Sequence, residues 1–256
     1  MRDLKVTVIQ EELVWEDIEA NIAVFDKKLD TLKVKTDLIV LPEMFTSGFS
    51  MKAAELAQTM SGPAVTWLLE KANALEADIV SSVIIKEQDC FFNRLLWVKP
   101  DGRVMSYDKR HLFRMAGEDK VYTAGNQKLI IELHGWKISP FVCYDLRFPI
   151  WTRNLNNVFD VSIFIANWPE VRAHHWKSLL RARAIENQCY TVGVNRVGTD
   201  GNNISYSGDS SIIDPLGNIS FQSAFTPCMY TATLSAATLE MVRKQFPVWM
   251  DADVDT

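Results

Sequence analysis

The chain has 256 residues, of which 48% are hydrophobic and 23% charged, a composition typical of a globular protein rather than a disordered one. Its 27 basic and 32 acidic residues give a net charge of −5, which argues against nucleic acid as a partner because phosphate binding requires a basic face. No apolar run approaches the ~18 residues of a membrane-spanning helix, and no signal-peptide core precedes the first strand-like pattern. We therefore expect one domain over residues 1–256, with neither a membrane nor a nucleic acid as partner.

Strand-like and helix-like patterns alternate along the first half of the chain. The helix at 18–32 is predicted from an apolar face with 3.6-residue spacing, and the helix at 63–77 from a proline in its first turn. A Pro-Asp-Gly turn predicts a hairpin of 94–98 with 104–107. The remaining strands predicted in this half cover residues 5–10, 38–41 and 78–85.

The second half continues the alternation and ends in short strands. Predicted strands cover 129–133, 137–142, 161–166, 191–195, 210–213, 218–221 and 229–234, and predicted helices cover 171–187 and 236–245. Alternating elements of this kind predict a layered α/β protein in which helices cover the outer faces of the sheets.

Cys143 stands directly after the apolar strand-like run 138–142, where the chain turns toward charged residues and Pro149. A thiol fixed at the end of a buried strand is a candidate nucleophile, because local dipoles and an adjacent base can favour its thiolate. An isolated cysteine in such a stretch is more often a buried core residue. The assignment therefore depends on other groups.

Two charged residues supply such groups. Glu43 follows the apolar run 38–41 and a proline, and Lys109 follows the strand-like residues 103–106. Both are expected at the carboxyl ends of strands, where active-site groups collect in α/β sheets. A base and a cation are what a thiol nucleophile and a developing oxyanion require. Either residue alone is more simply an ordinary surface charge.

These three segments together resemble the carbon–nitrogen hydrolase (nitrilase) superfamily. The matching motifs are Leu-Pro-Glu at 41–43, Tyr-Asp-Lys-Arg-His-Leu-Phe at 107–113 and Cys-Tyr-Asp-Leu-Arg-Phe-Pro at 143–149. The resemblance extends to residues 166–169, 181–187 and 195–198 and so covers nearly the whole chain. It is strongest to the omega-amidase branch, the bacterial 2-oxoglutaramate amidases in particular.

The resemblance implies a four-layer α-β-β-α sandwich with two mixed sheets. It implies Glu43 as base, Lys109 as oxyanion cation, Cys143 as nucleophile and the Tyr144 backbone N–H as a second oxyanion donor. Glu118, seven residues before Gly125, matches the family position of a carboxylate that supports the lysine. Activity would release ammonia from the omega-amide of a short dicarboxylic monoamide such as 2-oxoglutaramate, through a cysteine thioester.

A substrate of this kind requires a cation for its free carboxylate. Arg172, Lys52 and Arg114 are candidates in flanking loops, whereas Arg147 is expected to pair with Asp145 and fix the turn. Aromatic side chains that are candidates for the apolar wall of the pocket are Phe45, Phe49, Tyr144 and Trp168.

Other functions remain open from the residues alone. The same three catalytic groups serve a nitrilase, an N-carbamoyl hydrolase or an amidase for deaminated glutathione. A non-catalytic interaction protein is disfavoured, because it has no reason to retain Glu43, Lys109 and Cys143 together.

No cofactor is expected, and no His/Cys spacing indicates a metal site. Four cysteines at uneven positions do not form a disulfide framework, which favours a reducing, cytoplasmic location. The family resemblance implies a homodimer formed by the helix after the nucleophile strand and by the helix near 171–187. The apolar residues of that second helix fit core packing equally well.

Overall fold

The computed structural model describes residues 1–253. The longer helices are α1 (Ile18–Asp30), α3 (Pro63–Leu75), α5 (Ala173–Asn187) and α6 (Ala236–Gln245), and the shorter ones are α2 (Ala53–Leu56) and α4 (Pro149–Thr152). The strands are β1 (Leu4–Gln10), β2 (Leu38–Val40), β3 (Asp78–Glu87), β4 (Cys90–Val98), β5 (Val104–Asp108), β6 (Ile131–Leu133), β7 (Trp136–Val142), β8 (Val161–Ala166), β9 (Tyr190–Asn195), β10 (Val197–Thr199), β11 (Ser205–Ile213), β12 (Ile219–Ala224) and β13 (Cys228–Leu234).

The strands form two mixed sheets. One has six strands in the order β13-β1-β2-β3-β4-β5, and the other has seven, in the order β10-β11-β9-β8-β7-β6 with β12 beside β11. The centre of each sheet is parallel, β1-β2-β3 in the first and β7-β8-β9 in the second, and the outer pairings are antiparallel. The carboxyl ends of β7 and β8 lie side by side, and hydrogen bonds between Glu43 and Asn167 place the carboxyl end of β2 beside them.

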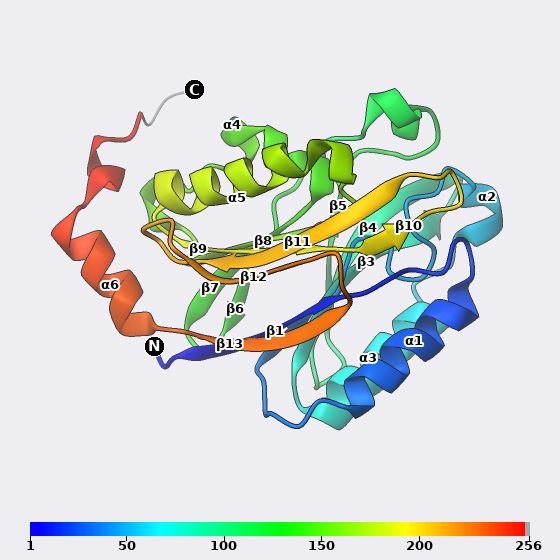
Figure 1. Cartoon of the computed structure of the whole chain (residues 1–256), viewed down its shortest axis with the longest axis horizontal. Helices are drawn as coiled ribbons and strands as arrows, with labels where there is room; N and C mark the ends of the chain where they lie inside the picture. Colours follow the sequence, from blue (N-terminus) through cyan, green and yellow to red (C-terminus); the bar gives the residue numbers. More distant parts are fainter. Residues whose placement is uncertain (254–256) are drawn as a thin grey trace.

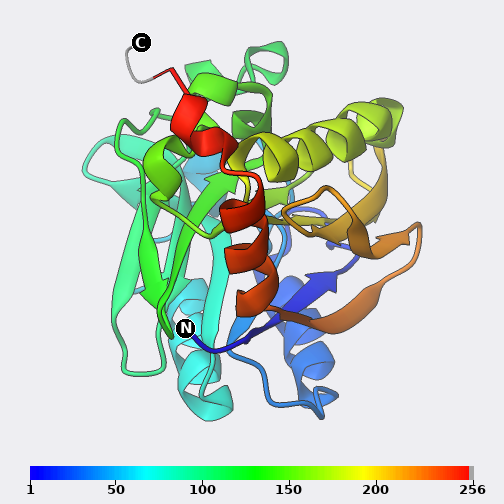
Figure 2. The same ribbon diagram turned by 90° about the vertical axis from the view of Figure 1, so that its left-hand side faces the viewer.

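Helices cover the outer faces of the sheets, as Figure 1 shows with α5 on one side and α1 and α3 on the other. Three buried clusters fill the spaces between the layers: one between the sheets, one under α1 and α3, and one under α5. Figure 2 shows α6 standing across the end of the sandwich, between the two helical layers. The architecture is the predicted four-layer α-β-β-α sandwich with two mixed sheets.

The sequence of β2 shows why a central strand is apolar at every position. Leu38 and Val40 pack between the two sheets, while Ile39 and Leu41 pack toward α1 and α3. Successive side chains of a strand point to opposite faces, so a strand covered on both faces is a continuous apolar run.

The predicted elements are confirmed with small changes in their bounds. The strand 161–166 and the helix 236–245 are observed as predicted, and the helix predicted at 171–187 begins at Ala173 after a 3₁₀ turn. The pattern did not predict α2 or β10, which are only four and three residues long. None of the helices within residues 1–253 is both long and apolar enough to cross a membrane.

Candidate active site

The turn after β7 places Cys143 at a sharp change of chain direction. Val142 ends the strand, and Cys143 begins a 3₁₀ turn, η3 (Cys143–Arg147), with a positive φ of 44°. A non-glycine residue in this left-handed region is strained, and such strain persists where the surrounding structure fixes the backbone. Tyr144 is the second residue of the turn, so its backbone N–H has no hydrogen-bond acceptor within the turn. This N–H can therefore donate to a bound molecule.

Glu43 lies after β2 and is held from three sides. Its Oε1 accepts hydrogen bonds from Lys109 Nζ at 2.9 Å and Asn93 Nδ2 at 2.8 Å. Its Oε2 accepts from the backbone N–H of Asn167 at 2.8 Å. The carboxylate is fully buried, and three donors fix its orientation.

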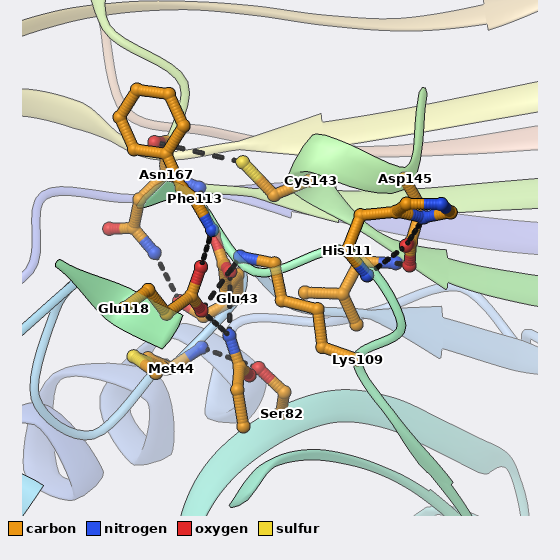
Figure 3. A network of polar contacts seen from close by, with 12 residues as sticks. Glu43, Met44, Ser82, Lys109, His111, Phe113, Glu118, Cys143, Asp145 and Asn167 are labelled. Carbon is orange, nitrogen blue, oxygen red and sulfur yellow. Dashed lines mark hydrogen bonds and ion pairs between the residues drawn. The ribbon is translucent and has the colours of Figure 1, made fainter. Parts of the chain in front are cut away.

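Lys109 lies after β5, with its ammonium between two carboxylates (Figure 3). Nζ is 2.9 Å from Glu43 Oε1 and 2.9 Å from Glu118 Oε1, and all three side chains are buried. Gly125 packs against this segment, because its N–H donates to Lys109 O at 3.0 Å and a Cβ there would lie 2.1 Å from the carbonyl oxygen of Asp108. This close approach explains why a glycine follows Glu118 at that spacing.

Electrostatics hold the cluster in a defined charge state. Burial alone would lower the pKa of Lys109, but the charges of Glu118 and Glu43 raise it above its ordinary value. Burial raises the pKa of Glu118, Lys109 opposes that rise, and the charge of Glu43 adds to it. Lys109 is therefore a cation at neutral pH.

The pKa of Cys143 is raised well above its ordinary value, first by burial and then by the negative charge of Glu43. Burial and the neighbouring carboxylate thus favour the neutral thiol over the thiolate. A neutral thiol beside a carboxylate instead fits removal of the proton by that carboxylate as attack begins.

A cavity of about 470 Å³ opens over Cys143 and Lys109. Glu43 and Glu118 lie behind Lys109, bonded to its ammonium. Phe49 forms part of the wall, with its ring centroid 5.1 Å from Lys109 Nζ. Within residues 1–253 the remaining lining residues include Trp15, Glu16, Lys52, Phe113, Tyr144, Arg147, Trp168, Arg172, Asp200 and Tyr206.

The carbon–nitrogen hydrolase family model matches residues 5–244. The chain belongs to the carbon–nitrogen hydrolase family. It is 50% identical over 256 residues to the omega-amidase YafV of Escherichia coli (strain K12), covering 99% of this chain and 98% of that one. It is 35% identical over 223 residues to the 2-oxoglutaramate amidase of Bacillus subtilis (strain 168), covering 86% of each.

A solved carbon–nitrogen hydrolase structure has the same fold. XC1258 of Xanthomonas campestris, a superfamily protein with an arsenic adduct in its active site, superimposes with a TM-score of 0.98 at 45% identity, covering 100% of this chain and 99% of that one. The four-layer sandwich is thus the fold of the family, and the chain is an enzyme of the carbon–nitrogen hydrolase type.

Most substrate residues predicted for this hydrolase line the cavity, but two do not. Phe49, Trp168 and Arg172 are in the wall, as are Tyr144 and Lys52. Phe45 is not: it is fully buried and packs against Phe25 and Trp67, at ring-centroid distances of 5.5 Å each. The Arg114 side chain is 86% exposed, lies 3.9 Å from Asp119 and is also outside the cavity lining.

The structure contradicts the expected pairing of Arg147 with Asp145. Asp145 is occupied by Tyr107, His111 and the Val142 N–H. Arg147 instead points into the cavity wall, with its guanidinium 4.7 Å from the Trp168 ring centroid and Nη2 3.0 Å from His175 Nδ1. Residues two positions apart in a 3₁₀ turn point in different directions, so closeness in the sequence does not bring these two side chains together.

Sequence reasoning missed two residues that hold Glu43. Asn93 lies on β4 and bridges both carboxylates, donating to Glu43 Oε1 at 2.8 Å and to Glu118 Oε1 at 3.4 Å. Asn167 donates its side chain to the Glu43 backbone oxygen at 2.6 Å. In the sequence, Asn93 is visible only as a polar residue within a strand that is otherwise largely apolar. The carboxylates that it bonds can be identified only once the pairing of β3 with β4 is known, in which Asn93 lies opposite Ile84.

Proposed function

We propose that the protein is an omega-amidase that hydrolyses the terminal amide of short dicarboxylic monoamides such as 2-oxoglutaramate. The observation that carries the proposal is that the Cys143 thiol, the Lys109 ammonium and the guanidinium groups of Arg147 and Arg172 line one cavity. The thiol and the Lys109 ammonium suit attack on an amide carbonyl, and the two guanidinium groups suit binding of a free carboxylate. The names of the E. coli and B. subtilis relatives support the same substrate class.

Glu43, Lys109 and Cys143 would act as a catalytic triad. Glu43 takes the thiol proton while Cys143 Sγ attacks the amide carbon. The oxyanion that forms is stabilised by Lys109 and by the Tyr144 N–H. Glu43 returns the proton to the leaving nitrogen, the C–N bond breaks, and ammonia departs. Glu43 then activates water, which hydrolyses the thioester and releases the acid and the thiol.

Glu118 would support Lys109 rather than exchange protons with the substrate. Its Oε1 contacts the ammonium, and its Oε2 accepts the Phe113 N–H at 2.5 Å. Both oxygens are therefore used to hold the segment that carries Lys109. A carboxylate in this position fixes the direction of the ammonium and preserves its charge.

Arg147 and Arg172 would bind the free carboxylate of the substrate. Neither forms an ion pair with any carboxylate of residues 1–253, whereas Lys52 is 2.7 Å from Glu16. Arg172 lies 5.4 Å from the Phe113 ring centroid, and burial together with Arg172 lowers the pKa of Arg147. Two neighbouring unpaired guanidinium groups in a cavity wall favour an anion, which a planar fork can bind through two hydrogen bonds.

A substrate panel tests the proposed function. Ammonia release is measured with 2-oxoglutaramate, succinamate, butyramide, a nitrile and an N-carbamoyl amino acid. Because a hydrogen bond to a charged group contributes about 1.5–3 kcal/mol, we expect kcat/KM for the two monoamides to exceed that for butyramide roughly 10- to 100-fold. Faster turnover of the nitrile or the N-carbamoyl compound contradicts the omega-amidase assignment.

Replacing Arg147 tests the carboxylate contact. In Arg147→Leu we expect kcat/KM for succinamate to fall roughly 10- to 100-fold while that for butyramide stays near the wild-type value. Arg114→Leu, at a neighbouring arginine outside the cavity lining, is the matched control and leaves both values unchanged. An equal loss on both substrates would show that Arg147 supports the turn instead of binding the substrate.

Removal of metal ions by a chelator tests whether Lys109, rather than a metal ion, stabilises the oxyanion. In the proposed mechanism a side-chain ammonium stabilises the oxyanion and a side-chain carboxylate moves the proton, so each step is complete without a metal ion. We expect prolonged incubation with EDTA, followed by gel filtration, to leave kcat unchanged. A loss of activity that zinc or magnesium restores contradicts this mechanism.

We also propose a cytoplasmic homodimer. Ile150 on α4 is 78% exposed, and Ile185 on α5 is 49% exposed, whereas Trp176 and Leu180 of α5 are buried against its sheet. These two exposed residues fit an interface through α4 and α5. The four cysteines are unpaired in the described structure, which is consistent with a reducing compartment.

A further inference from the structure

We infer that Asp145 is a positioning residue that sets the spacing between Lys109 and Cys143. The inference rests on the proposed roles of those two residues. Asp145 is fully buried two positions after Cys143, forms no ion pair with Arg147 and does not line the cavity. Its carboxylate joins the two segments that carry the reacting groups.

Four donors converge on the Asp145 carboxylate, and they come from both segments. Oδ2 accepts from Tyr107 Oη at 2.7 Å and from the Val142 N–H at 3.0 Å. Oδ1 accepts from the His111 N–H at 3.0 Å and from His111 Nδ1 at 2.7 Å. Tyr107 and His111 flank Lys109 in the chain, and Val142 immediately precedes Cys143. One buried group therefore fixes the backbone on both sides of the ammonium and directly before the thiol.

The surrounding aromatic rings restrict the same contacts. The His111 ring stacks on Phe148 at a centroid distance of 3.8 Å and an interplanar angle of 8°. Trp151 Nε1 donates to Tyr107 Oη at 3.0 Å, which leaves the Tyr107 hydroxyl proton directed to Asp145. A carboxylate only accepts, so His111 Nδ1 carries a proton in this contact. Figure 3 shows His111 and Asp145 beside the turn of Cys143, on the opposite side of Lys109 from Glu118.

An asparagine at this position cannot satisfy four donors, because half of its terminal group is itself a donor. In Asp145→Asn one of the two segments must therefore move. A displacement of about 1 Å in an active site can cost ~10² in rate. We expect the loss in the reaction step, because the Asp145 side chain does not line the cavity.

The test is a double-mutant cycle between Asp145→Asn and Lys109→Met. The substrate is whichever amide the wild-type enzyme hydrolyses best, so a failure of the omega-amidase assignment leaves this test intact. We expect Asp145→Asn to lower kcat by ~10² with a change in KM of less than about threefold. When Lys109 is already methionine, we expect Asp145→Asn to reduce kcat by a factor at least about tenfold smaller than in the wild-type background.

Asp160→Asn is the matched control. Asp160 is another buried carboxylate, directly before β8, and it accepts from the Lys137 N–H at 2.9 Å and from Arg243 Nη1 at 2.6 Å, outside the cavity lining. It should lower the melting temperature without lowering kcat. A wild-type kcat in Asp145→Asn, or losses that multiply fully in the cycle, overturns the inference.

His111→Phe keeps the test informative if Asp145→Asn does not fold. Phenylalanine preserves the stack on Phe148 and the backbone N–H but removes the Nδ1 donor. We expect kcat to fall about 5- to 10-fold, less than in Asp145→Asn. In the Lys109→Met background, His111→Phe should lower kcat by a smaller factor than it does in the wild-type background. An unchanged kcat in His111→Phe counts against the inference.

Discussion

Cys143→Ala is expected to lower the rate of amide hydrolysis by roughly 10⁴-fold or more, because no second nucleophile is available to form the acyl intermediate. The substitution removes one atom at a cavity surface and retains a Cβ at the positive φ of 44°. The fold should therefore be unaffected, and the melting temperature should stay close to that of the wild type. The measurement is steady-state ammonia release together with a thermal unfolding curve.

Cys189→Ala is the control for this result. Cys189 is fully buried beside Ser162, and it does not line the cavity. Its removal should reduce stability and leave kcat at the wild-type value. If Cys143→Ala hydrolyses amides at more than a small fraction of the wild-type rate, the nucleophile has been misassigned.

Lys109→Arg is expected to lower kcat at least about 100-fold, even though it keeps the positive charge. The ammonium fits between two carboxylates at 2.9 Å each in a fully buried site, and a planar guanidinium has neither that shape nor that point charge. Lys109→Met should be less active still. It also leaves two buried carboxylates without their cation, which should cost about 3–5 kcal/mol of stability.

The control for Lys109 is Lys28→Arg. Lys28 is also ion-paired, 2.6 Å from Glu11, but it lies on α1 outside the cavity lining. Rates are measured at a temperature where unfolding curves show each variant to be folded. Near wild-type rates in both arginine variants would mean that Lys109 is a structural cation and that the oxyanion is stabilised elsewhere.

The fold was predictable from the sequence because its strands are locally marked. A strand such as β8 is apolar at nearly every position and is bounded by turn residues, so its bounds follow from the pattern alone. By contrast, β10 has three residues and exists only because it pairs with β11 across Val197 and Ser207. Pairing of this kind depends on tertiary structure and leaves no local signal.

The site was partly predictable for the same reason. Glu43, Lys109 and Cys143 each follow a strand, so their common location follows from topology. The orientation of Arg147 could not be predicted from the sequence, because it depends on which face of the η3 turn contacts Trp168 and His175. The state of the thiol was also unpredictable, since the burial and the neighbouring charge that raise its pKa arise only when β2 and β7 lie in facing sheets.

The proposed thioester is most directly tested by intact-protein mass spectrometry of a reaction with succinamate, quenched in acid within the first turnovers. The proposed mechanism predicts a population heavier by one succinyl group, mapped by peptide digestion to Cys143 and absent from Cys143→Ala. An adduct mapped to another residue, or one that still forms in Cys143→Ala, would contradict a Cys143 thioester.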